Sequence, residues 1–119
     1  MVCTDGKRSC FRDMSMNDSD VCSRYKFYEV KPGCDPSEND RFLQQIDFQP
    51  GLISNVGVVG VTNECLLAIV KDRLDSFQAG PFPCEENAIA REHVVEALNQ
   101  LAKRTEDREK RGVEGEYTA

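Results

Sequence analysis

The sequence has no long apolar run and no excess of basic charge. None of its apolar segments approaches the roughly 18 to 20 residues that a membrane-spanning helix needs, and its first residues contain no hydrophobic centre of the kind found in a secretory signal. Acidic residues outnumber basic ones by 21 to 15, which gives a formal charge of −6, whereas affinity for a nucleic-acid backbone depends on a cationic surface. We therefore expect neither a membrane protein nor a protein that binds DNA or RNA.

Cysteine and histidine do not form the usual disulfide, metal or catalytic patterns. Six cysteines among 119 residues fall below the roughly 8 to 10% typical of a disulfide scaffold, so we expect reduced thiols and a cytoplasmic location. His93 is the only histidine, and no CxxC, HxxxH or HExxH motif occurs. Cys84 is the thiol nearest to it in sequence, which leaves a cysteine-dependent hydrolase as one alternative. Our expectation is a protein without metal, cofactor or enzyme activity.

The length of 119 residues is that of one domain of ordinary size. Residues 1–23 are rich in aspartate and serine and show no periodicity, which predicts a poorly ordered or loosely attached arm. Residues 24–119 are then expected to form a single domain. Its parts would be a β-rich part (24–61), a helical hairpin (62–111) and a tail (112–119).

The β-rich part has two segments typical of strands. Residues 24–31 are dense in aromatic residues and end at a Pro-Gly turn. A second strand is predicted over 41–49, where three apolar side chains would share one face at a spacing of two: Phe42, Ile46 and Phe48. Residues 52–61 alternate apolar residues with glycine and fit either a short bent strand or a tight loop. We expect these strands to form a small antiparallel sheet.

Two helices are predicted to follow the sheet. Thr62 or Asn63 can cap the first, whose apolar residues recur at spacings of three and four until a turn rich in glycine and proline. The second begins at Glu85 or Glu86 and ends near Lys110, with acidic residues in its first turn and basic ones in its last. Helices joined by so short a turn should pack antiparallel as a hairpin. The predicted fold is therefore α+β, with a small N-terminal antiparallel sheet and a C-terminal helical hairpin.

The second helix carries an apolar stripe that continues as arginines. The stripe contains Ala90, Val94, Ala97 and Leu101 and is followed at the same spacing by Arg104, Arg108 and Arg111. One interpretation is a core that ends at Leu101 and a charged helix end that projects into solvent. The other is that the arginines face an anion, because a guanidinium suits phosphate and can stack on a base. In an acidic protein, such a cluster favours a small phosphorylated ligand over a polymer.

Three blocks within residues 62–116 point to a known family: FQAGPF, ENA and KRTEDREKRGVEG. With them the region resembles the helical hairpin of phage-encoded nucleotide-signal sponges, the Thoeris anti-defence (Tad) family, which shares its hairpin with the anti-CBASS two family. Members of this family are not enzymes; they bind a host immune signal and keep it from its effector. The resemblance implies a phage anti-defence sponge that acts in the cytoplasm of the infected bacterium.

The resemblance also implies the ligand and its contacts. The ligand would be a cyclic ADP-ribose isomer of the glycocyclic type, made by bacterial TIR enzymes. Phe77 matches the aromatic residue that stacks on it, Asn87 matches an amide, and Arg104 and Arg108 match two arginines. A π-face, an amide and guanidinium groups suit a purine, a ribose and a diphosphate. Because Asn87 and the arginines lie about 25 Å apart on one helix, the pocket should form between protomers.

The family assembles as dimers that can build hexamers, and the resemblance implies a homo-oligomer here. Some members hold cyclic di- or trinucleotides at separate sites, for which Thr105 and Arg111 are the second-site or phosphate contacts expected in this chain. The N-terminal half supplies a further aromatic residue and an arginine, with Tyr25, Phe27 and Arg41 as candidates. The alternative function is an oligomeric helical-hairpin interaction module that docks on a host protein and needs no small ligand.

Overall fold

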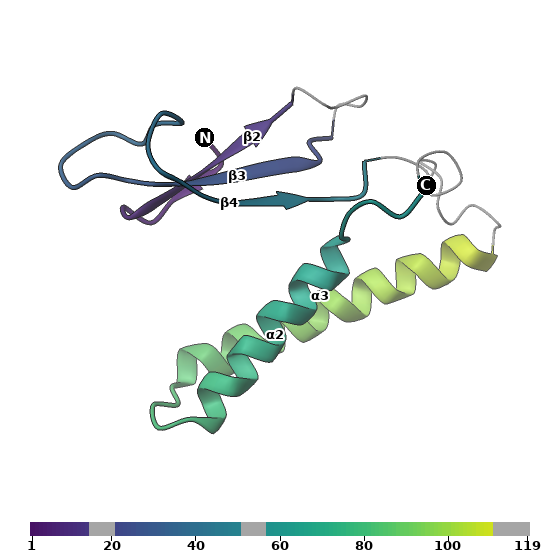
Figure 1. The fold of residues 1–119 in the computed structure, drawn as a ribbon. Coiled ribbons are helices and arrows are strands. Elements are labelled where there is room, and N and C mark those ends of the chain that lie inside the picture. Colours follow the sequence, from purple (N-terminus) through teal and green to yellow (C-terminus); the bar gives the residue numbers. More distant parts are fainter. Residues whose placement is uncertain (15–20, 51–56, 111–119) are drawn as a thin grey trace. The chain divides into compact units, whose positions relative to one another are not determined.

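A computed structural model describes residues 1–14, 21–50 and 57–110. They form two compact units, a sheet unit up to Gly60 and a hairpin unit from Val61. The sheet unit contains β1 (Cys3–Thr4), β2 (Arg8–Asp13), β3 (Arg24–Glu29) and β4 (Phe42–Asp47), and the hairpin unit contains α2 (Asn63–Ala79) and α3 (Glu85–Lys110) (Figure 1). The predicted α+β fold, a small antiparallel sheet followed by a helical hairpin, is confirmed.

The sheet is a simple meander. Its strand order is β1-β2-β3-β4, and each strand pairs antiparallel with the next one in sequence. The buried residues of the sheet unit are few and small or medium in size: Ser9, Cys10, Cys22 and Val30. Because few side chains are buried, the backbone hydrogen bonds of β3 to its neighbours on both sides contribute much of the stability of this unit.

The N-terminal segment differs from the predicted loose arm. β1 pairs with β2, and all six residues of β2 pair with β3, so residues 3–13 belong to the sheet. The sequence of β2, RSCFRD, has no regular alternation of apolar and polar residues, and its strand form depends on pairing with the aromatic strand β3. Residues 15–20 and the predicted tail 112–119 lie outside the described residues, and the proposed division of 24–119 stays a prediction.

A β-bulge changes the face on which one predicted apolar side chain lies. Gln44 of β4 pairs with Phe27, but the next pair joins Tyr28 to Phe42, so Leu43 is skipped. The Phe42 ring therefore packs edge-on against Tyr28 at 5.9 Å, whereas the Phe48 ring packs against Tyr25 at 5.7 Å. Because Tyr25 and Tyr28 are three residues apart on one strand, they lie on opposite faces. The prediction that Phe42 shares a face with Phe48 is wrong.

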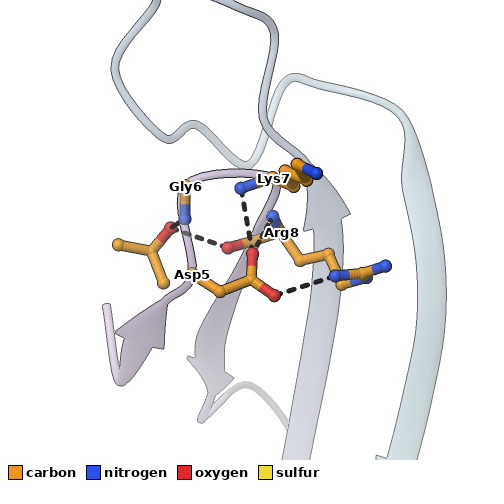
Figure 2. A network of polar contacts seen from close by, with 5 residues as sticks. Asp5, Gly6, Lys7 and Arg8 are labelled. Carbon is orange, nitrogen blue, oxygen red and sulfur yellow. Dashed lines mark hydrogen bonds and ion pairs between the residues drawn. The ribbon is translucent and has the colours of Figure 1, made fainter.

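A tight turn between β1 and β2 is closed by one carboxylate. The Asp5 carboxylate accepts hydrogen bonds from the backbone N–H groups of Lys7 and Arg8, at 2.9 and 2.8 Å, and pairs with the Arg8 guanidinium at 2.8 Å (Figure 2). Gly6 has a φ of 86°, a conformation that favours glycine. The Thr4 hydroxyl donates a hydrogen bond to the Arg8 carbonyl at 2.7 Å. These contacts hold the short strand β1 against β2.

Asp5 is expected to titrate far below an ordinary aspartate. Hydrogen bonds from the Lys7 and Arg8 backbone, with the Arg8 guanidinium, lower its pKa from 3.8 to about 2. Since the folded pKa lies below the unfolded value, the stabilisation is complete above about pH 4 and is lost as pH falls toward 2. A carboxyl-carbon NMR titration measures this pKa, and Arg8→Ala should raise it. An unshifted Asp5 in the intact protein would contradict the turn described here.

The helices begin and end close to the predicted residues. The Thr62 hydroxyl accepts a hydrogen bond from the Cys65 N–H at 3.2 Å, so Thr62 is the N-cap of α2. The helix ends where the Gly80 N–H turns back to the Phe77 carbonyl at 3.2 Å, and the prolines that follow cannot continue it. The sequence leaves residues 52–61 as either a short strand or a tight loop, and residues 52–56 of this segment lie outside the described residues.

Removing the α2 cap should destabilise the hairpin unit moderately. Thr62→Ala leaves the Cys65 N–H without its side-chain acceptor, and we expect the free energy of unfolding to fall by about 1 kcal/mol. Denaturant titration followed by helical circular dichroism measures the change. Thr62→Ser keeps the oxygen and serves as the control; equal stability of the serine and alanine variants would show that the cap contributes nothing.

Candidate ligand-binding site on the helical hairpin

The two helices run antiparallel and contact each other along one stripe of each (Figure 1). On each helix one set of half-buried residues recurs at alternating spacings of three and four, as in coiled-coil packing. On α2 these residues are Leu67, Lys71, Leu74 and Gln78, and on α3 they are Arg91, Val94, Leu98 and Leu101. No residue of α2 is fully buried, so the hairpin alone covers its apolar side chains only in part.

An ion-pair cluster lies toward the turn end of this stripe. The Asp75 carboxylate pairs with the Lys71 ammonium at 2.9 Å and with the Arg91 guanidinium across the two helices. These hydrogen bonds, from Lys71 and then from Arg91, lower the pKa of Asp75. The Arg91–Asp75 ion pair joins the two helices near their connecting turn.

The stripe of α3 agrees with the predicted one at Val94, Ala97 and Leu101, which are half-buried, and departs from it at Ala90, which is exposed. Arg91 is half-buried instead, with its guanidinium paired to Asp75. Beyond Leu101 the stripe passes through Thr105, which is half-buried, to Arg108, which is only 6% exposed, while Arg104 is exposed beside it. The two predicted site arginines therefore occupy different environments.

Phe77 and Asn87 lie together at the turn end of the hairpin. Phe77 is the third residue from the end of α2 and Asn87 is the third of α3. The Phe77 ring is 54% exposed, and the Arg73 guanidinium lies over it at 5.5 Å from the ring centroid. Asn87 is half-buried, and its backbone N–H donates to the Cys84 sulfur at 3.4 Å. An exposed aromatic face and an amide are thus available from two helices.

One glutamine holds the turn between them. The Gln78 side-chain amide donates to the Cys84 carbonyl and accepts from the Cys84 N–H, both at 2.9 Å. Gln78 directly follows Phe77, and Cys84 directly precedes α3. The paired hydrogen bonds therefore fix the end of one helix relative to the start of the other.

The predicted phosphate contacts lie at the opposite end of α3. Arg104 is seventeen residues beyond Asn87, which is about 25 Å along a helix. Arg104, Thr105 and Arg108 fall within two turns, so the structure brings them together with one another and away from Phe77. Arg111, the remaining predicted contact, lies outside the described residues. A single hairpin thus presents two separate half-sites.

Cys84 and His93 do not lie next to each other in the hairpin. Cys84 directly precedes α3 and His93 lies nine residues further on, which is about 13 Å along a helix. Within residues 1–14, 21–50 and 57–110, no group of three histidine, cysteine, aspartate or glutamate residues is arranged to hold a metal ion. In the same residues no helix is both long enough and apolar enough to span a bilayer.

The N-terminal candidates are engaged within the sheet unit. The Tyr25 ring packs on Phe48, and the Arg41 guanidinium pairs with the Glu29 carboxylate at 3.2 Å. Phe27 lies opposite both Cys10 and Gln44 in the sheet. The sheet face opposite to Tyr25 and Phe27 carries a shallow cleft of about 260 Å³. It is lined by Phe11, Arg12, Asp13, Met14, Lys26, Tyr28 and Glu38. None of the predicted site residues lines that cleft.

Sequence reasoning missed three residues that position the half-site at the turn. Arg73 could have been found, because it lies four residues before Phe77 and so on the same helix face. Gln78 gives no such signal, since its role depends on the path of the turn. Arg91 was missed because a charged residue was not expected on the packed stripe.

Comparison with known proteins identifies the hairpin. The family model described as the Acb2/Tad1 hairpin domain matches residues 43–106, more than half of the chain. This chain belongs to the Acb2/Tad1 hairpin family. The Acb2/Tad1 match includes Phe77, Asn87, Arg104 and Thr105 and ends before Arg108.

A relative named Thoeris anti-defense 1, from Bacillus phage SBSphiJ7, is 48% identical over 75 residues. These residues are 63% of this chain and 53% of the relative, so the match spans about half of the relative's length. These matches confirm the family membership that the three sequence blocks indicate. The membership applies to the Acb2/Tad1 hairpin part of the chain.

Proposed function

We propose that this chain is a phage anti-defence protein that blocks Thoeris immunity by sequestering a cyclic ADP-ribose-type signal made by bacterial TIR proteins. It binds the signal without cleaving it, in the cytoplasm of the infected host. The observation that carries the proposal is the half-exposed Phe77 ring at the end of α2, with Asn87 at the start of α3 across the same turn, in a hairpin of the Acb2/Tad1 family. The name of the phage relative supports the same role.

The turn end of the hairpin recognises the base and ribose. An exposed aromatic ring offers a face on which adenine can stack, and stacking is favourable for any purine. The Arg73 guanidinium over one part of the Phe77 ring keeps the ring in place and adds positive potential. Asn87 offers both a donor and an acceptor for ribose hydroxyls or base edges.

The other end of α3 recognises the diphosphate. Arg104 and Arg108 are four residues apart and so start from one side of the helix. The exposed Arg104 guanidinium is the direct contact for phosphate oxygens, whereas Arg108, at 6% exposed, has to turn outward to pair with them as well. Repulsion between these like charges is relieved when an anion binds. Thr105 between them and Arg111 beyond them are the additional phosphate or second-site contacts, through which the protein also binds cyclic di- or trinucleotides and blocks CBASS.

The complete pocket forms between protomers of a homo-oligomer. The distance of about 25 Å between the two half-sites exceeds the reach of one small nucleotide. Antiparallel association of two hairpins would bring the turn end of one against the arginine end of its partner and create two equal pockets. Exposed apolar residues on both helices favour such association: Ile69, Val70 and Ile89 are 56%, 43% and 45% exposed. We propose a dimer that builds toward a hexamer.

Calorimetric titration with glycocyclic ADP-ribose tests the proposal. We expect tight binding, and heat denaturation of the complex should release the ligand chemically intact. Release of an altered nucleotide would make the protein an enzyme. No heat with this ligand, with other cyclic ADP-ribose isomers or with cyclic di- and trinucleotides would overturn the sponge and favour a module that docks on a host protein.

A further inference from the structure

Two cysteines lie directly opposite each other at the edge of the sheet. Cys3 of β1 pairs with Cys10 of β2 in the antiparallel register. Opposite residues of antiparallel strands have Cα atoms about 4.5 to 5.5 Å apart and side chains on the same face. A disulfide requires Cα atoms roughly 4.4 to 6.8 Å apart. The backbone of β1 and β2 thus already has the geometry in which a disulfide can close.

The two thiols differ in exposure. Cys3 is exposed, whereas Cys10, directly opposite it in the register, is only 4% exposed. Burial, and then the neighbouring Cys3, raise the pKa of the Cys10 thiol. A soluble oxidant therefore reaches Cys3 first, and Cys10 is held beside it as the second thiol.

We propose that Cys3 and Cys10 are a redox-responsive modification site that forms an intramolecular disulfide when the protein meets a disulfide oxidant such as oxidised glutathione. The Cys3 thiolate attacks one sulfur of the oxidant and releases one glutathione thiolate. The Cys10 thiol then loses its proton to solvent, attacks the Cys3 sulfur and expels the second glutathione. Two protein thiols are oxidised and one glutathione disulfide is reduced, so electrons and atoms balance.

The bond would join an otherwise minimal strand to the sheet. β1 contains only two residues and lies at the sheet edge, where it is held by the turn around Asp5. The disulfide would close a ring of residues 3–10 around that turn. Strand β1 would then stay attached to β2 even when the hydrogen bonds of the turn open.

Peptide mapping of the full chain tests this site. The protein is incubated with excess oxidised glutathione, the remaining thiols are alkylated, and the protein is digested with trypsin without reduction. Cleavage after Lys7, Arg8 and Arg12 separates the two cysteines, so the expected product is the peptide 1–7 linked to the peptide 9–12. Alkylation of Cys3 should fall about tenfold relative to the reduced protein, while the exposed Cys34 is recovered alkylated or as its mixed disulfide with glutathione and not linked to the peptide 1–7 or 9–12.

Three other outcomes would overturn the proposal. Cys22 also lies near enough to influence the Cys10 thiol, and a link between the peptides 9–12 and 13–24 would show that Cys22 is the partner. Peptides without any link, or with glutathione retained on Cys3, would show that the pair does not close. Cys3→Ser should abolish the link without disturbing the buried Cys10, and Cys34→Ser should leave it unchanged.

Discussion

Replacing both Arg104 and Arg108 by alanine is expected to weaken the binding of glycocyclic ADP-ribose by about 100-fold or more. Each guanidinium that pairs with a phosphate oxygen contributes about 1.5 to 3 kcal/mol as a charge-assisted hydrogen bond. Calorimetry on the wild type and the double variant measures the loss. The proposed site is wrong at this end of α3 if the double variant binds with unchanged affinity.

The control for this experiment removes the same charge from the same helix end. Lys103→Ala with Lys110→Ala also deletes two positive groups, and both side chains are exposed. We expect a change of a few-fold at most, because a lysine that does not touch the ligand acts only through screened, longer-range attraction. Circular dichroism must show the same helix content in both double variants, and Arg104→Ala alone tests the exposed arginine without altering Arg108.

Replacing Phe77 by alanine should weaken binding by about 10-fold to 100-fold, because stacking of a base on an aromatic ring is worth about 1 to 3 kcal/mol. The chain offers a matched control in Phe82, which is 86% exposed in the same turn region and which we do not assign to the pocket. Phe82→Ala should leave affinity unchanged, and Phe77→Tyr should restore most of it. Equal losses for Phe77→Ala and Phe82→Ala would point to a general effect on the turn rather than to stacking on Phe77.

The helical hairpin could be predicted from the sequence almost residue by residue. Apolar spacing, a threonine cap and a turn with two prolines are local signals, and the helices end within about a turn of where these signals place them. The position of the packed stripe could not be predicted so well. Ala90 is small and apolar, which suits a helix interface better than the charged side chain of Arg91. Arg91 nevertheless takes part in the interface, because its guanidinium pairs with the Asp75 carboxylate of the other helix.

The sheet was harder to predict because its strands depend on one another. β2 carries no periodic signal of its own and becomes a strand through its pairing with β3. The bulge moves Phe42 to the other face because Leu43 is skipped in the pairing. Nothing in the residue type of Leu43 predicts that a bulge forms there. For the candidate site, residue chemistry and family resemblance suggest which side chains are used. The spacing of Asn87 and Arg104 along one predicted helix also gives the separation of about 25 Å, whereas the burial of Arg108 is known only from the structure.

The connection of the strands has a consequence for how the chain reaches its folded state. Each strand of the meander pairs with its neighbour in sequence, and the two helices are likewise consecutive. Contacts within each unit therefore close short loops, which costs little chain entropy and allows fast folding. Each unit can form as soon as its own residues have left the ribosome, without waiting for a distant segment. Such a chain leaves each strand and helix without its neighbour only briefly during synthesis.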